Sequence, residues 1–177
     1  VELFVLDDGW FGNRFDEHRA LGDWYDNIEK TGGGLKHLAD KIRGIGLDFG
    51  IWVEPEMISE DSDLFRKHPE FAMRVPGREP TRLRWQLCLN LADEKVQNYV
   101  VRVISDVIAR SGATYVKWDY NRTLTDPFGN GISQGEYFHR YMLGYYRIVS
   151  RITEKFPDVL FEGCAGGGGR FDLGNLC

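Results

Sequence analysis

Four short apolar runs, separated by segments with helical periodicity, constrain the fold of this chain more than any other feature. The runs lie at residues 2–8, 47–54, 113–121 and 158–163 (ELFVLDD, LDFGIWVE, ATYVKWDYN and DVLFEG). Because each run is mostly apolar rather than alternating, it is typical of a parallel strand covered on both faces. The alternation of strand and helix therefore predicts a parallel α/β fold with right-handed crossovers.

Apolar residues at helical spacing mark three segments, at residues 35–42, 96–108 and about 134–156. The second has the most continuous apolar stripe, which is typical of a helix packed on a sheet. We expect Asp93 to be its N-cap and Gly112 its end.

Two parallel α/β architectures fit this order, an open doubly wound sheet and a (β/α)8 TIM barrel. The length of 177 residues favours the open sheet, because a barrel needs about 250 residues. The strand ends favour the barrel, since every run ends in polar residues and a barrel gathers its chemistry on that rim. An open sheet would also be expected to carry a phosphate-binding glycine loop after the first strand, where this chain reads DDGWFGNR. We therefore predict an incomplete TIM barrel of about four consecutive β/α units, with residues 1–177 as one partial catalytic domain and no second domain.

Composition excludes several classes of function. Lys plus Arg number 22 and Asp plus Glu 27, a net charge of −5, and no basic stripe suggests nucleic acid as a partner. No apolar run approaches the roughly 20 residues that span a bilayer. Three cysteines (Cys88, Cys164 and Cys177) at no metal-like spacing argue against disulfides and zinc, and favour a reducing, cytoplasmic location. We expect no cofactor.

Asp119 is the strongest candidate for chemistry. In an extended strand, Lys117, Asp119 and Asn121 share one face and apolar residues share the other. Burial would raise the pKa of Asp119, whereas the nearby lysine would lower it and keep the carboxylate ionised. A positioned carboxylate is the nucleophile of retaining glycosidases. The alternative is a structural Lys–Asp pair at a strand edge.

Acidic residues at the ends of the first two runs admit a second hypothesis. Asp7 and Asp8 suit either sugar hydroxyls or a divalent cation, for which Glu54 and Glu56 would supply further oxygen ligands. The alternative is that one aspartate caps the turn at Gly9.

Other residues near the strand ends have both functional and structural readings. Trp10 and Trp52 either stack on a sugar ring or pack in the interior. The glycine run at 163–172 (GCAGGGGRFD) lacks both phosphate-binding patterns, so it permits close approach to a neutral sugar or forms a plain turn. Arg84 either reaches over the rim or stays solvated.

Taken in order, LFVLDDGWFG with LGDW, GIWVEPEMIS, KWDYNR and EGCAGGGGRFD closely resemble the catalytic barrel of bacterial α-galactosidases of glycoside hydrolase family thirty-six. The resemblance covers essentially the whole chain. It implies retaining, double-displacement hydrolysis of terminal α-galactosides such as melibiose and raffinose-type oligosaccharides.

The resemblance also implies site roles. Asp119 corresponds to the nucleophile. The implied substrate contacts are Lys117 and Asn121 beside it, Asp7 and Asp8 at the 4- and 6-hydroxyls of galactose, Trp52 at a subsite, Cys164 and Gly166 near the 2-hydroxyl, and Arg84. After the arginine the family usually has Asn-Gln, whereas this chain has Trp85, a departure from the pattern.

In the family, the general acid/base is an aspartate on the next barrel strand, beyond Cys177. We therefore expect the chain alone to be inactive. The resemblance also implies that the parent protein is a homo-oligomer. Three alternatives stay open: a galactosyl-transferring relative of the raffinose-synthase type, a metal-dependent enzyme and a non-catalytic sugar-binding half-barrel.

Overall fold

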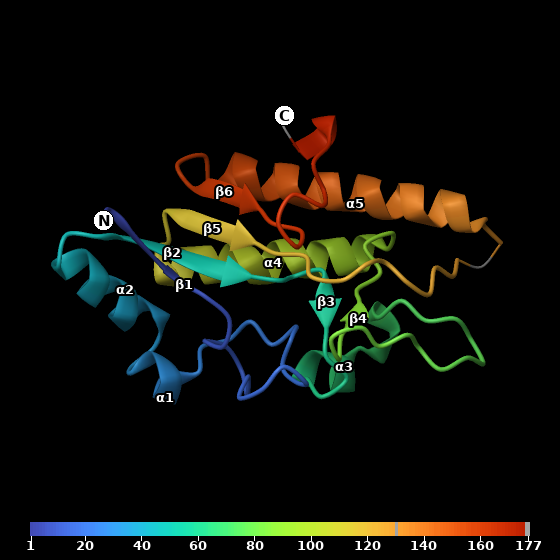
Figure 1. The fold of residues 1–177 in the computed structure, drawn as a ribbon, viewed down its shortest axis with the longest axis horizontal. Helices are drawn as coiled ribbons and strands as arrows, with labels where there is room; N and C mark the ends of the chain where they lie inside the picture. Colours follow the sequence, from blue (N-terminus) through green and yellow to red (C-terminus); the bar gives the residue numbers. More distant parts are fainter. Residues whose placement is uncertain (130, 176–177) are drawn as a thin grey trace.

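A four-stranded parallel sheet organises the chain in the computed structural model, which describes residues 1–129 and 131–175. Its strands are β1 (Leu3–Leu6), β2 (Asp48–Val53), β5 (Tyr115–Trp118) and β6 (Leu160–Gly163), hydrogen-bonded in the order β1-β2-β5-β6. The strands therefore lie side by side in the order in which they occur along the chain (Figure 1). Each coincides with one of the four predicted runs, which confirms the parallel α/β class.

Three long helices follow the predicted segments. They are α2 (Leu35–Gly44), α4 (Glu94–Ser111) and α5 (Gln134–Lys155). The predicted cap of α4 is confirmed, because the Asp93 side chain accepts a hydrogen bond from the backbone N–H of Lys95. Gly112 ends the helix at φ 61°, a left-handed conformation that glycine adopts without strain.

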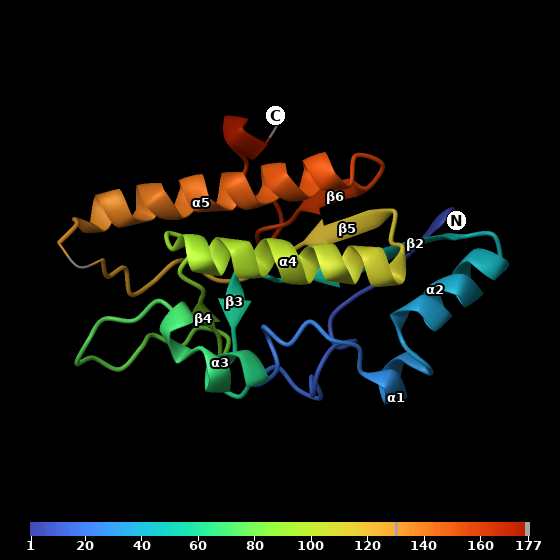
Figure 2. The same ribbon diagram turned by 180° about the vertical axis from the view of Figure 1, so that it is seen from behind.

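The helices lie behind the strands, with α4 and α5 side by side (Figures 1 and 2). Helix α5 also packs closely on the segment that precedes α4, because a side-chain methyl at Gly144 would lie 1.9 Å from the carbonyl oxygen of Leu91. On the strand side of this layer, Val116 and Trp118 of β5 are buried. The helical layer thus fixes which face of the sheet is interior.

The sequence predicts that all four strands are covered on both faces. Among them, only β2 is fully covered, since every residue after Asp48 is buried. Strands β1 and β6 are largely half-buried or exposed, because each has a paired neighbour on one side only within the described sheet. The β2 backbone is also confined laterally, since a methyl at Gly50 would lie 3.0 Å from Tyr115 and 3.1 Å from Val5.

Several short elements were not predicted. The chain between β2 and α4 contains an antiparallel pair, β3 (Met57–Ile58) and β4 (Leu87–Cys88), together with α3 (Asp63–Lys67) and a 3-10 turn (Pro69–Phe71). Helix α1 (Ile28–Thr31) precedes α2, and a 3-10 turn (Leu173–Asn175) follows β6.

In the described part of the chain, no helix combines the length and hydropathy required to cross a bilayer. Cys88 and Cys164 are free thiols, and Cys177 lies outside the described residues.

Candidate active site

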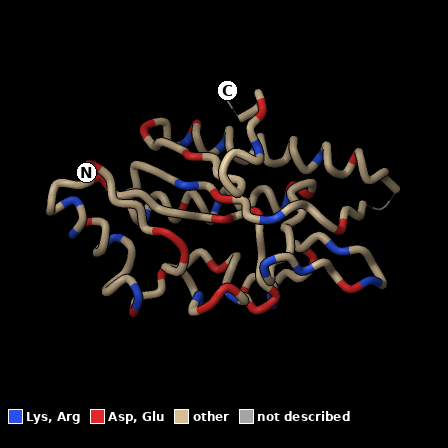
Figure 3. The backbone as a smooth tube through the Cα atoms, viewed as in Figure 1, with Lys and Arg blue, Asp and Glu red and all other residues tan. Residues whose placement is uncertain are grey.

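The polar residues predicted to form a site converge where the parallel strands end. Asp7 and Asp8 follow β1, Asp119 and Asn121 follow β5, and Cys164 follows β6. Charges of both signs gather around these strand ends (Figure 3).

An ion pair links the ends of two strands that are not neighbours. The Nζ atom of Lys117 on β5 lies 3.5 Å from Oδ2 of Asp7, which follows β1. Because β2 lies between these strands, the two side chains must extend over the same face of the sheet.

Asp119 is held by hydrogen bonds at both carboxylate oxygens. Oδ2 accepts from Nε1 of Trp52 at 3.0 Å and from Nδ2 of Asn121 at 2.6 Å, and Oδ1 accepts from the backbone N–H of Tyr120 at 2.9 Å. The Asp119 backbone N–H donates to the carbonyl of Val53, which continues the β2–β5 ladder. The side chain is therefore fixed in orientation, and the residue is 6% exposed.

The environment favours an ionised Asp119. Burial raises the pKa of this carboxyl, but hydrogen bonds from Trp52, Asn121, Cys164 and the Tyr120 backbone outweigh it, so its pKa lies below the ordinary value. The sequence predicts that Lys117 supplies this effect, whereas the structure pairs Lys117 with Asp7. The predicted ionised state thus arises mainly from hydrogen bonds.

Glu54, directly after β2, differs from Asp119 in its electrostatics. It is 1% exposed and accepts hydrogen bonds from the Asn121 backbone N–H at 2.7 Å and from Nε2 of Gln86 at 3.1 Å. Burial raises the pKa of Glu54 to about 7, and the charge of Asp119 adds to this rise, against the hydrogen bond from Asn121. Two neighbouring carboxyl groups therefore have pKa values displaced in opposite directions.

Asp8 is held by an arginine that our sequence analysis did not identify. Arg14 donates to Asp8 from Nε at 3.0 Å and from Nη2 at 2.9 Å, and its Nη1 donates to the carbonyls of Glu17 and Arg19. Arg14 is buried, so one side chain ties the loop after β1 to an acidic residue of the candidate site. No spacing rule marks this contact in the sequence.

Asp7 accepts a backbone hydrogen bond from the residue that follows it. Its Oδ1 accepts a hydrogen bond from the Asp8 backbone N–H at 2.8 Å. The side chain remains exposed and pairs with Lys117 through its other oxygen, so Asp7 stays accessible from solvent.

For the two tryptophans, the structure favours packing. Trp10 and Trp52 are 2% and 3% exposed, and both rings lie close to Phe11 and Trp24. Trp52 nevertheless contacts the site, because its indole N–H donates to Asp119.

Glu56 does not lie with Glu54, as the metal hypothesis required. It is fully buried and accepts hydrogen bonds from Nε1 of Trp118 at 2.9 Å and from the hydroxyl of Tyr141 on α5 at 2.8 Å. The Glu56 side chain thus points toward the helical layer. Among the described residues, no group of three or more His, Cys, Asp or Glu side chains is arranged to hold a metal ion.

The glycine-rich turn after β6 is anchored rather than loose. The Cys164 backbone N–H donates to the carbonyl of Trp118 at 2.8 Å, and Gly166 adopts a φ of 57°. At the end of the turn, Nη2 of Arg170 lies 2.7 Å from Oε1 of Glu56 and its guanidinium lies over the ring of Tyr145 at 3.9 Å. This ion pair, in which Glu56 is fully buried, places the turn beside β5, the strand that leads to Asp119.

Arg84 lies in a two-residue turn before β4. It is exposed, its charge lowers the pKa of Glu54, and its φ is 53°. The next residue, Trp85, also has a positive φ, of 58°.

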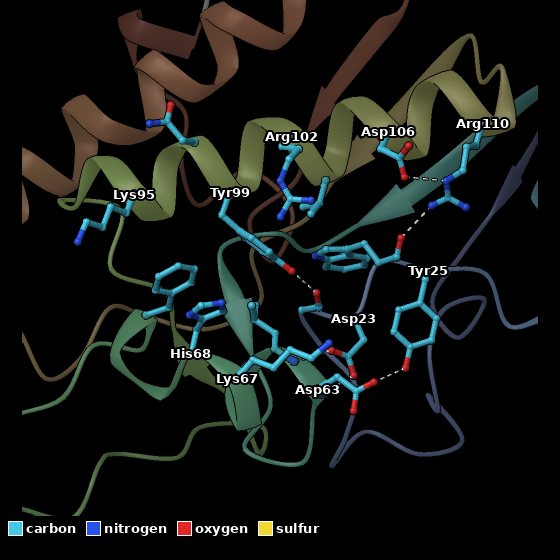
Figure 4. Close-up of a pocket in the computed structure, with 16 residues that line it drawn as sticks. Asp23, Tyr25, Asp63, Lys67, His68, Lys95, Tyr99, Arg102, Asp106 and Arg110 are labelled. Atoms are coloured by element: carbon cyan, nitrogen blue, oxygen red, sulfur yellow. Dashed lines mark hydrogen bonds and ion pairs between the residues drawn. The ribbon is translucent and has the colours of Figure 1, made fainter.

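A large groove lies elsewhere. It has a volume of about 850 Å³ and runs between α3, α4 and the loop around Asp23 (Figure 4). None of the predicted site residues lines it, and several of its polar groups pair with each other or with nearby backbone, as Tyr25 does with Asp63 and Tyr99 with the carbonyl of Gly22. Convergent side chains, rather than volume, therefore identify the candidate active site.

Comparison with known proteins agrees with the motifs. The family model for melibiase matches residues 1–177. The chain is 50% identical to the α-galactosidase AgaA of Geobacillus stearothermophilus over 99% of the chain and 25% of the relative, and 46% identical to the α-galactosidase Mel36A of Lactobacillus acidophilus over 98% and 24%.

Solved structures show the same relationship. A crystal structure of the α-galactosidase from Lactobacillus brevis superposes with a TM-score of 0.94 at 44% identity, covering 98% of this chain and 24% of that one. The crystal structure of a variant of AgaA from G. stearothermophilus in complex with raffinose superposes with a TM-score of 0.95 at 50% identity. The match covers 99% of this chain and 25% of that one. The chain thus spans about a quarter of the length of these relatives, and it belongs to the melibiase family.

Proposed function

We propose that this chain contributes the nucleophile and galactose-binding residues of a retaining α-galactosidase, with its four β/α units forming part of a (β/α)8 barrel. The observation that carries the proposal is Asp119, a shielded carboxylate with a lowered pKa where the strands end. The similarity to curated α-galactosidases over the whole chain supports it.

In the proposed first step, Asp119 attacks the anomeric carbon of an α-galactoside and the leaving oxygen departs on the opposite side. A covalent β-galactosyl ester forms, and water then hydrolyses it with a second inversion, so that the α configuration is retained. Hydrogen bonds from Trp52 and Asn121 orient the carboxylate before attack.

The galactose contacts in this proposal come from neighbouring strand ends. Asp7 and Asp8 accept hydrogen bonds from the 4- and 6-hydroxyls, Lys117 and Asn121 lie beside the nucleophile, and Cys164 with Gly166 bounds the 2-hydroxyl. Arg84 closes the mouth above Glu54. The fixed Asp8–Arg14 pair would give this part of the site its selectivity for galactose.

Glu54 has the pKa expected of a general acid, yet we do not propose it as the proton donor. Both of its oxygens already accept hydrogen bonds, from Asn121 and Gln86, and the residue is buried. We propose instead that the acid/base comes from outside these 177 residues, since the relatives are about four times as long. On its own, the chain would then lack general-acid assistance worth about 10² to 10⁴ in rate.

The nucleophile can be tested in the intact protein with an aryl α-galactoside. Asp119→Ala is expected to lower kcat by about 10⁴ or more. Added azide should then restore turnover and give β-galactosyl azide, because it replaces the missing carboxylate on the same face of the sugar. Asp106→Ala, an acidic residue of the distant groove, is the control. Full activity of Asp119→Ala, or azide rescue giving the α-azide, contradicts the proposal.

A further inference from the structure

An exposed aromatic pair joins two loops that are far apart in the sequence. The rings of Trp85 and His18 stack with centroids 4.3 Å apart and an interplanar angle of 17°. Trp85 is 54% exposed and His18 is also exposed, so the pair lies at the surface. Packing alone does not require a tryptophan that leaves half of its surface in water.

The turn that carries Trp85 is strained. Leu83 and Gln86 pair across it, with the Gln86 backbone N–H donating to the carbonyl of Leu83 at 3.0 Å. Arg84 and Trp85, the two central residues, both have positive φ, as in the type I′ turns that favour Asn-Gly. Glycine at position 85 would remove this strain, and residues held in such conformations cluster at functional sites.

On one side, the pair is connected to the candidate active site through Gln86. The Gln86 side chain donates to Glu54, Glu54 accepts from the Asn121 backbone, and the Asn121 side chain donates to Asp119. Arg122 further fixes this side by donating to the carbonyl of Gln86.

On the other side, the pair is connected through Arg14. Its guanidinium binds Asp8 and the carbonyls of Glu17 and Arg19, which flank His18. The stacked rings therefore bridge the loop of Asp8 and the turn above Glu54.

We infer that Trp85 and His18 form the surface that binds the leaving-group sugar of an α-galactoside. This inference rests on the proposed function. Because Asp119 is shielded and the leaving oxygen departs opposite to the attacking carboxylate, the second sugar must point away from Asp119, toward solvent. The exposed face of Trp85 offers the apolar C–H face of a pyranose a stacking partner there.

The inference is tested by titrating galactose and melibiose into the intact protein with Asp119→Asn as background, so that neither ligand is turned over. Trp85→Ala should weaken melibiose binding about 3- to 10-fold and leave galactose binding unchanged, which corresponds to the loss of one aromatic contact. Trp85→Phe should recover most of the loss. Phe128→Ala, which removes an exposed ring from another loop, is the matched control and should change neither affinity.

The variant Trp85→Gly shows whether weaker melibiose binding reflects a lost contact or a destabilised fold. It should raise the midpoint of thermal unfolding, because glycine relieves the left-handed conformation, and still weaken melibiose binding. Equal effects of Trp85→Ala on galactose and melibiose, or no effect on either, would overturn the inference and leave the proposed function standing. If the background protein binds no galactose, the proposed function fails and the inference fails with it.

Discussion

The buried carboxyl of Glu54 should make the stability of this chain depend on pH. Its pKa is raised from an ordinary 4.5 to about 7 in the folded state, mainly by burial. Between these two values the folded protein binds one proton more than the unfolded protein does. The free energy of unfolding therefore falls as pH rises through this window and levels off above about pH 7.

The size of the effect follows from the displacement of the pKa. One pKa unit corresponds to about 1.4 kcal/mol, so the Glu54 contribution should fall by about 3 kcal/mol between pH 4.5 and 8. Glu54→Gln removes the titrating carboxyl group and keeps the shape of the side chain. The variant also has a hydrogen-bond partner available, because Oε1 of Gln86 is buried without one and its amide can rotate to accept from the new NH2 group.

The assay is guanidinium unfolding of wild type and Glu54→Gln at pH 5, 6, 7 and 8. Other titrating groups are common to both proteins and cancel in the difference. Relative to Glu54→Gln, wild type should lose about 2.5 kcal/mol between pH 5 and 8, whereas the exposed control Glu17→Gln should follow wild type. Parallel curves for wild type and Glu54→Gln would refute the assignment of a raised pKa to this buried carboxyl.

Three further predictions concern other parts of the molecule. Glu56→Ala should lower the free energy of unfolding by about 3–5 kcal/mol, since it leaves the largely shielded guanidinium of Arg170 without its fully buried carboxylate partner, as denaturant titration would measure. Gly144→Ala should cost about 3 kcal/mol because its methyl would collide with the carbonyl of Leu91, whereas Gly135→Ala in the same helix has open space and should be neutral or stabilising. Asp8→Ala should reduce the preference for α-galactosides over α-glucosides by about 10-fold or more in kcat/KM, and an unchanged ratio would exclude Asp8 from sugar selection.

Local patterns in the sequence predicted the main elements and the face on which Asp119 lies. Mostly apolar runs identified the strands, and capping chemistry placed Asp93 and Gly112 correctly at the ends of α4. The two-residue period of a strand put Lys117 and Asp119 opposite Trp118, whose ring contacts Tyr145 of the helical layer.

Contacts between distant segments were not predictable in the same way. Glu56 was expected at the rim beside Glu54, but after Val53 the chain leaves the sheet, and the two-residue alternation of a strand no longer applies. The stacking of Trp85 on His18 joins loops whose relative position depends on the whole fold. For the same reason, no pattern in the sequence indicates that Arg14 binds Asp8.

The register between β2 and β5 also limits which mutations the candidate active site can tolerate. Trp52 pairs with Lys117 and Val53 with Trp118, and the Asp119 backbone continues that ladder. A slip of β5 by a single position would turn Trp118 toward the candidate active site and bury Asp119 against the helices. Insertions within this strand should therefore abolish both folding and chemistry, whereas new specificities would have to arise in the loops.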